Sequence, residues 1–325
     1  MKILCDNEII TVFTQEHMVK NDFFLRLIEI QLEPDEMLTE LSFCLCAGGD
    51  LCYQRTYQRH QIEQRFRYAE KELARYRSGS MERILGRKTA PACAIMHEYF
   101  SVYTFAPADM CVVTVTSNLT VERKEILLKA YKSRNRYCFP MRGTFLVSDT
   151  YVSINSHRWC RNSEFAMDIG AFSKDLCTPV IEGMEVYAAC AGTVVEVFDG
   201  LEDSTEKTDF DGIERNCGEH ARIDGNHVLI EHDGNELTLY SHLLKGSVCV
   251  KTGDRVEALT PIGKVGSSGS SMAAHLHFHA MKEGISGPGI PIQCCNVVSF
   301  FGDPCGLEES TNIIRTVQPD FAAGE

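Results

Sequence analysis

One short segment restricts the local fold of this chain more than any other. Beginning at His275 it reads His-Leu-His-Phe-His, so that polar and apolar side chains alternate. Side chains two positions apart on a β-strand point to the same face. The segment is therefore predicted to be a strand with His275, His277 and His279 on one face and Leu276 and Phe278 in the core. Imidazoles that converge on one face are a natural zinc site.

The second half of the chain has the sequence pattern of an antiparallel β domain, which we expect over residues 151–300. Glycine is frequent, and short apolar strands such as 192–197 alternate with tight turns. The segment Asp-Gly-Asn at 233–235 predicts a hairpin turn into a strand at 237–240. The polar, acidic stretch 199–224 is expected to be a long surface loop.

Residues 1–135 are also predicted to be rich in β-strands. Short runs of β-branched and aromatic residues, for example 9–13 and 111–116, lie between turn signals and favour a β-sandwich-like fold. The exception is 58–86, where apolar residues such as Ile62 recur at spacings of three and four. That spacing predicts one amphipathic helix.

The connecting and terminal segments complete the expected organisation. Residues 136–150 contain Pro140 and Gly143 and are expected to connect the two domains, and residues 301–325 are expected to be a carboxy-terminal tail. The length of 325 residues suits two domains. The predicted fold class is mainly β: a sandwich-like domain with one helix, followed by an antiparallel β domain.

Composition excludes some classes of partner. The formal net charge is -13, and nucleic-acid binding is not expected because phosphate contacts need a basic face. No stretch approaches the roughly 18 consecutive apolar residues of a membrane span, and the amino terminus lacks the apolar core of a secretory signal. The sequence alone therefore favours the cytoplasm. The 15 cysteines lack zinc-ribbon spacing and are expected to be free thiols.

Two further segments carry side chains that suit a metal site. Tyr240 and His242 are two positions apart in a predicted strand and are expected to share a face. Asp168 lies in an apolar run, where a carboxylate needs a partner. His157 and Glu164 precede it. Catalytic zinc sites combine three ligands of this kind and keep a position for water.

The order of these motifs resembles the M23 (lysostaphin/LytM-like) metallopeptidases over about residues 150–295. The segments that carry the resemblance are Asp168, Gly225-Asn226-His227-Val228, Tyr240-Ser241-His242-Leu243, Gly253-Asp254, Gly263 and His275-Leu276-His277-Phe278. The resemblance implies a small antiparallel β fold with a groove, a zinc ion held by His, Asp and His, and cleavage of peptide bonds in bacterial peptidoglycan. It matches Asp168 and His277 to zinc ligands, and His242 and His275 to the two catalytic histidines.

The first zinc ligand departs from the family pattern. The family usually has a histidine four residues before the aspartate, where this chain has Glu164. The alternatives are His157, Glu164 and His279, ranked in that order, or a missing ligand and an inactive site. Tyr240 and Asn226 are expected to line the substrate groove.

The sequence thus predicts a zinc-dependent endopeptidase whose partners are peptidoglycan peptides. One of His242 and His275 would take a proton from water and the other would stabilise the oxyanion, and the sequence does not assign which. Two alternatives stay open. One is a catalytically degenerate M23-like binding or regulatory module, suggested by Glu164 and the missing signal peptide. The other is a cytoplasmic zinc peptidase with another substrate. The family usually acts on the cell wall, and no partner is assigned to residues 1–135.

Overall fold

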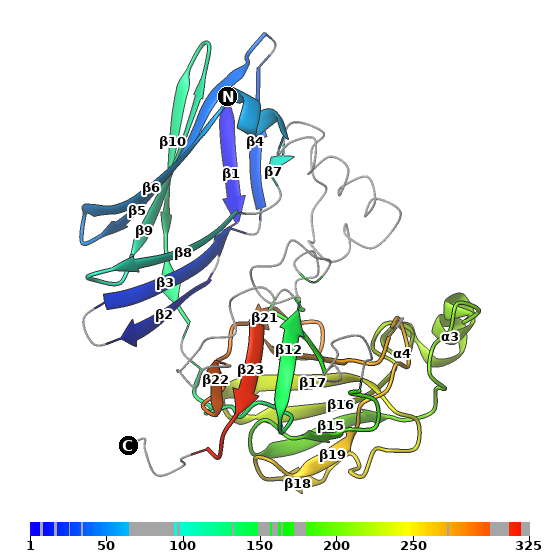
Figure 1. Ribbon diagram of the computed structural model, residues 1–325. Helices are drawn as coiled ribbons and strands as arrows, with labels where there is room; N and C mark the ends of the chain where they lie inside the picture. The colour runs from blue at the N-terminus through cyan, green and yellow to red at the C-terminus, as the bar shows by residue number, and fades with distance from the viewer. Residues whose placement is uncertain are drawn as a thin grey trace. The chain divides into compact units, whose positions relative to one another are not determined.

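The computed structural model divides the chain into two compact units, Met1–Lys132 and Ser133–Glu325 (Figure 1). The residues that it describes are 1–6, 9–15, 18–25, 27–33, 35–64, 94–95, 98–131, 133–148, 157, 162–163, 165–171, 180–271, 273–299 and 312–319. Strands dominate both units, so the fold is mainly β as predicted. In these residues no helix is long and apolar enough to cross a membrane.

Within its described residues, the amino-terminal unit contains three small sheets. An antiparallel sheet of four strands has the order β10-β9-β5-β6, formed by β5 (Leu38–Ala47), β6 (Asp50–Gln58), β9 (Met110–Ser117) and β10 (Val121–Leu127). A second sheet of four strands has the order β11-β2-β3-β8, formed by β2 (Ile9–Gln15), β3 (Met18–Leu25), β8 (Glu98–Thr104) and β11 (Lys129–Ala130). In it β11 runs parallel to β2, and the other pairs are antiparallel. The third joins β1 (Lys2–Asp6), β4 (Leu27–Gln31) and β7 (Ala94–Ile95).

One apolar core joins these sheets. Phe43 of β5, Val113 of β9, Phe100 of β8 and Ile28 of β4 are all fully buried and belong to the same cluster. Residues from all three sheets therefore pack together, as in the predicted sandwich-like domain.

The helix predicted at 58–86 begins within the described residues. Residues 59–64 are helical, and Ile62 is buried in the same core. The remainder of that prediction, residues 65–86, lies outside the described residues.

The carboxy-terminal unit is built on one large antiparallel sheet. Its order is β18-β15-β16-β17-β20-β13-β12-β23-β22, with β21 paired to β20. The strands are β12 (Thr144–Ser148), β13 (Met167–Gly170), β15 (Gly192–Phe198), β16 (Asn226–His232), β17 (Glu236–Leu243), β18 (Arg255–Val256), β20 (Leu276–Lys282), β21 (Gly289–Ile290), β22 (Val297–Ser299) and β23 (Asn312–Thr316). A small second sheet pairs β14 (Glu185–Tyr187) with β19 (Pro261–Lys264). Every residue of β17 is buried, so this central strand is covered on both faces.

Two segments take part in this sheet although the sequence suggested a connector and a tail. Within 136–150, β12 pairs with β13 on one side and β23 on the other. Within 301–325, β23 lies between β12 and β22. Phe145, Val147 and Ile314 are almost fully buried there. Proline and glycine near these strands give the segments the composition of a linker. Their apolar side chains are nevertheless buried, in a core formed with strands that are distant in the sequence.

The stretch 199–224 is not a plain loop. It contains α3 (Phe210–Cys217) and α4 (Glu219–Asp224), which lie near one end of the sheet in Figure 1. The Asp209 carboxylate caps α3 by accepting a hydrogen bond of 2.9 Å from the Gly212 N–H. This cap and the acidic residues of both first turns favour helix in spite of the polar composition.

Candidate metal centre

The centre of the candidate site is a pair of residues that face each other across two strands. Asp168 of β13 is the register partner of His277 of β20. Their side chains lie on the same face, with Nδ1 of His277 3.1 Å from Oδ1 of Asp168. Directly opposed residues of antiparallel strands have Cβ atoms about 5 Å apart, which brings side chains into contact.

His157 completes a group of three possible ligands. Its Nε2 is 3.6 Å from Oδ2 of Asp168, and its ring packs edge-on against that of His277 with centroids 4.7 Å apart. One donor atom from each of His157, Asp168 and His277 lies within 4.8 Å of the others. Two imidazole nitrogens and a carboxylate oxygen at this spacing form the type of donor set that divalent zinc uses.

The other two alternatives for the first zinc ligand are Glu164 and His279. Glu164 lies outside the described residues. His279 shares a strand face with His277, as expected, but its Nδ1 lies 3.0 Å from Nε2 of His277, whereas Asp168 is on the Nδ1 side of the same ring. His279 therefore lies on the Nε2 side of the His277 ring, away from Asp168. The two faces predicted for this strand are present, since Phe278 packs against Tyr240 whereas His277 meets Asp168, although both faces are buried.

His242 and His275 lie beside this group. Their ring centroids are 4.7 Å apart, and the ring of His242 is 5.8 Å from that of His277. Nε2 of His275 is 3.5 Å from Oδ1 of Asp168. The five predicted residues His157, Asp168, His242, His275 and His277 are thus brought together.

A β-bulge directs His242 to this face. Asn226 pairs with Leu243 and Val228 with Tyr240, so Ser241 and His242 together oppose the single residue between Asn226 and Val228. His242 has a φ of 63°, in the left-handed region that non-glycine residues seldom adopt. Bulges re-aim side chains in this way next to functional sites. The expectation that Tyr240 and His242 share a face is therefore wrong: the extra residue breaks the alternation.

Tyr240 and Asn226 do not line a groove. Tyr240 is fully buried, contacts Phe278 and accepts a hydrogen bond of 2.7 Å from the Ala189 N–H. Asn226 is also fully buried; its Oδ1 accepts from the N–H groups of Gly200 and Leu201. Both side chains stabilise the framework behind the site, since each buried polar atom has found a partner.

The electrostatics fix the protonation of two groups. Burial alone would raise the pKa of Asp168, but the charge of His157 and the hydrogen bond from His277 lower it below its usual range. Burial, assisted by His275 and His277, lowers the pKa of His242 to about 3. Asp168 is therefore an anion and His242 a neutral imidazole near pH 7.

Backbone carbonyls select the tautomers of the two flanking histidines. Nδ1 of His242 lies 2.8 Å from the Ser268 carbonyl oxygen, and Nδ1 of His275 lies 2.8 Å from that of Ala273. A carbonyl can only accept, so Nδ1 of each ring carries the proton. Nε2 of neutral His242 is left with its lone pair.

Sequence reasoning missed Asp224 and Ser268. Asp224, at the end of α4, accepts hydrogen bonds from Ser241 at 3.2 Å and from His220 at 3.2 Å, and it is an electrostatic neighbour of His277 and His279. Ser268 holds His242 through its carbonyl. The sequence signal for Asp224 was an acidic residue directly before Gly225-Asn226. No local pattern in the sequence connects Ser268 to His242.

Comparison with known proteins gives a family match for part of this unit. Residues 175–287 match the model of peptidase family M23. The chain is 48% identical over 63 residues to the glycyl-glycine endopeptidase ALE-1 of Staphylococcus capitis, and 38% identical over 64 residues to the peptidoglycan DD-endopeptidase ShyC of Vibrio cholerae. These matches cover 19% and 20% of this chain but 17% and 14% of the two relatives, so the chain spans under a fifth of their length.

Among solved structures, the chain is similar to the catalytic domain of the prophage-encoded M23 protein EnpA of Enterococcus faecalis. The identity is 20%, the TM-score is 0.29, and the alignment covers 49% of this chain and 90% of that one. The sequence match to the family contains His242, His275 and His277, whereas Asp168 and His157 precede it. The family resemblance predicted from the order of the motifs is confirmed by the match of residues 175–287 to peptidase family M23.

Proposed function

We propose that the carboxy-terminal unit is a zinc-dependent endopeptidase that cleaves peptide cross-links of bacterial peptidoglycan. The observation that carries the proposal is the group His157, Asp168 and His277, flanked by His242 and His275 on the same side of the sheet. The family match supports peptidase activity, and the two curated relatives, both endopeptidases by name, support the substrate class.

The donor set fits zinc. His157, Asp168 and His277 would hold the ion, the ionised state of Asp168 supplies negative charge, and three protein ligands leave a position free. When bound, zinc polarises a carbonyl group and makes water a competent nucleophile near neutral pH.

The flanking histidines have separable roles in this proposal. His242 is neutral with an unprotonated Nε2, so it accepts a proton from the attacking water. His275 has a more exposed side chain, and its Nε2 faces Asp168. In its protonated form that nitrogen donates a hydrogen bond to the oxyanion of the tetrahedral intermediate.

The test combines metal content with hydrolysis of cross-linked muropeptides. The 325-residue chain is expected to retain about one zinc per chain. Asp168→Ala and His277→Ala should lose the metal and the activity together. His275→Ala should keep the metal and lose activity by about 10²- to 10⁴-fold. His60→Ala, at an exposed position in the other unit, is the matched control.

Two results would replace this proposal with another. Peptidoglycan binding without turnover, unaffected by the double variant His242→Ala/His275→Ala, would identify a degenerate binding module. Turnover of short unrelated peptides in preference to muropeptides would identify a peptidase with another substrate. Failure to take up zinc after reconstitution would exclude both metallopeptidase hypotheses.

A further inference from the structure

Two cysteines far apart in the sequence meet in the carboxy-terminal unit. Sγ of Cys138 and Sγ of Cys295 are 3.8 Å apart, although 157 positions separate them. Both are free thiols. Neither belongs to the candidate metal centre, so this contact has no role in the function proposed above.

The backbone holds the two residues in register. Tyr137 and Cys294 form a parallel β-bridge, and the Cys295 N–H donates to the Tyr137 carbonyl at 2.8 Å. Cys138 and Cys295 are the next pair along this bridge. Neighbours across such a bridge have backbones about 4.8 Å apart, which falls within the Cα separation of about 4.4–6.8 Å found in disulfides.

Further hydrogen bonds fix both sides of the bridge. The Cys138 N–H donates to the Ala189 carbonyl at 2.7 Å, and the Phe139 N–H donates to Oδ1 of Asn296 at 2.7 Å. The backbone is thus already arranged for a cross-link. Closing the sulfurs from contact to a bond of about 2.05 Å needs side-chain rotation and little backbone movement.

The two thiols differ in access. Cys138 is fully buried, and burial followed by the proximity of Cys295 raises its pKa to about 12. Cys295 is exposed. An oxidant in solution therefore meets Cys295 first, and Cys138 follows because its Sγ already lies against that of Cys295.

We propose that Cys138 and Cys295 form a reversible disulfide by exchange with a small-molecule disulfide of the glutathione type. The Cys295 thiolate attacks one sulfur of that molecule and releases one thiol, which leaves a mixed disulfide. Cys138 then gives up its proton as it attacks the Cys295 sulfur, and the second thiol leaves with that proton. The two cysteines lose two electrons and two protons, and the oxidant is reduced to two thiols.

The disulfide would close a loop that contains every residue of the candidate metal centre, from His157 to His277. A cross-link over a loop of this length restricts the unfolded chain and so stabilises the folded unit, with its metal centre unchanged. The inference depends on the thiol contact alone, so it can fail or succeed independently of the peptidase proposal.

To test this, the 325-residue chain is treated with oxidised glutathione and its peptides are mapped without reduction. A Cys138–Cys295 cross-linked peptide should form and should disappear with dithiothreitol. Thermal unfolding followed by circular dichroism should occur about 10 °C higher in the oxidised protein. Zinc content should be equal in both states.

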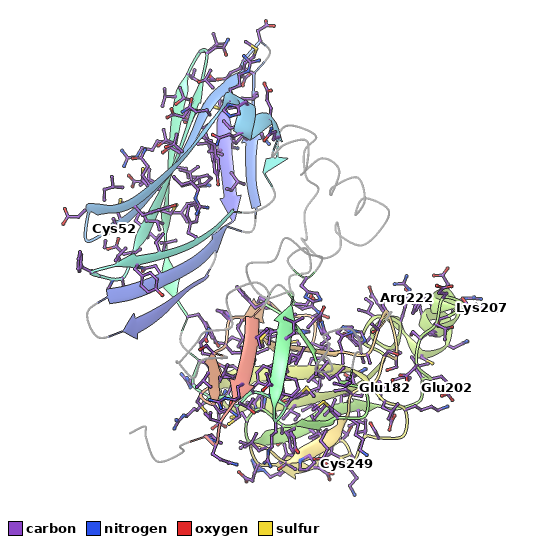
Figure 2. The ribbon with its side chains drawn as sticks, in the orientation of Figure 1. Cys52, Glu182, Glu202, Lys207, Arg222 and Cys249 are labelled. Atoms are coloured by element: carbon purple, nitrogen blue, oxygen red, sulfur yellow. The ribbon has the colours of Figure 1, made fainter. Side chains whose placement is uncertain are left out.

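Matched variants decide the assignment. Cys138→Ser and Cys295→Ser should abolish the oxidation-dependent shift. Cys249→Ser should keep it, because Cys249 is an exposed thiol elsewhere in the unit (Figure 2).

Three results would overturn the inference. The first is a stable mixed disulfide at Cys295 while Cys138 stays reduced. The second is a disulfide that involves Cys190 or Cys294 instead. The third is zinc bound by Cys138 and Cys295 in the His277→Ala variant. The peptide map of the wild-type protein decides even where a serine variant does not fold.

Discussion

At the scale of the residue, His277 has a partner on each ring nitrogen. Nδ1 faces Asp168 at 3.1 Å and Nε2 faces Nδ1 of His279 at 3.0 Å. A histidine that ligates a metal generally donates its other N–H to a neighbour, which fixes the tautomer and the ring orientation. With a cation on the Nδ1 side, the N–H of His277 is on Nε2, and His279 is the acceptor that holds it there.

We therefore expect His279→Leu to weaken zinc affinity by about 10- to 100-fold, because His277 loses the acceptor that orients it. His279→Asn places an oxygen near the former Nδ1 and should recover part of the loss. Competition with a chelator measures the affinity, and a cobalt-substituted spectrum reports the geometry. Equal affinity in all three proteins would show that His279 only fills space.

At the scale of the element, a contact between Ser268 and Gly225 positions His242 of β17. Ser268, whose carbonyl oxygen holds the His242 ring, is packed against Gly225. A Cβ at Gly225 would lie 2.4 Å from the backbone of Ser268, and Gly225 itself has a φ of +64°. Only glycine satisfies both the close approach and the backbone conformation.

Gly225→Ala is accordingly expected to destabilise the unit by about 3 kcal/mol and to reduce hydrolysis, since Ser268 must move. The matched control is Gly253→Ala, where φ is +93° but the Cβ would meet nothing within 4 Å. Backbone strain alone should cost about 1–2 kcal/mol there and leave activity unchanged. Urea unfolding of both variants measures the difference, and equal losses would contradict the contact argument.

Helix α4 is joined to β17 through Asp224, and this link should depend on pH. Burial alone would raise the pKa of Asp224, but the hydrogen bond from His220 and neighbouring histidines lower it to about 2. The hydrogen bond to Asp224 raises the pKa of His220. A carboxyl with a lowered pKa stabilises the fold above its unfolded pKa and loses that contribution as pH falls through the folded value. For His220 the contribution is complete below its unfolded pKa and is lost as pH rises through the folded one.

The pair should therefore stabilise the protein most between about pH 4 and pH 6.5. The free energy of unfolding of wild type relative to Asp224→Asn should fall by about 2 kcal/mol between pH 5 and pH 2. His220→Gln should remove the high-pH limb of the profile. Denaturant titrations at a series of pH values test this, and a constant difference would refute the assigned ionisation.

At the scale of the whole molecule, the carboxy-terminal unit depends on strands from both ends of its sequence. β12 precedes the candidate site and β23 follows it, yet they pair with each other and continue the sheet that carries Asp168. Ile314 of β23 is fully buried, whereas its neighbour Ile313 is 50% exposed. Alternate residues of a strand point to opposite faces.

This alternation provides a test in two adjacent residues. Ile314→Ala should destabilise the unit by about 3 kcal/mol through the cavity it leaves. Ile313→Ala should change the free energy of unfolding by less than about 1 kcal/mol. Thermal or urea unfolding compares the two. Similar losses would mean that β23 is not part of the core.

The sequence by itself determined the features that depend on local periodicity. The alternation of histidine with Leu276 and Phe278 predicts a buried strand with histidines on one face, and the turn at 233–235 predicts the hairpin that precedes His242. These patterns need only the two-residue repeat of a strand and the preferences of turn residues. The motif order predicted the resemblance to peptidase family M23, which the match of residues 175–287 confirms, because that order records spacing along the chain.

Only the tertiary structure decided which side chains meet. The bulge at His242 reverses the face expected from alternation, and it places Tyr240 in the core instead of a groove. His157, eleven positions before Asp168, joins that carboxylate and His277 through the fold, while His279 lies behind His277. Pairings between distant strands depend on how the whole chain buries its apolar surface, which no local pattern encodes.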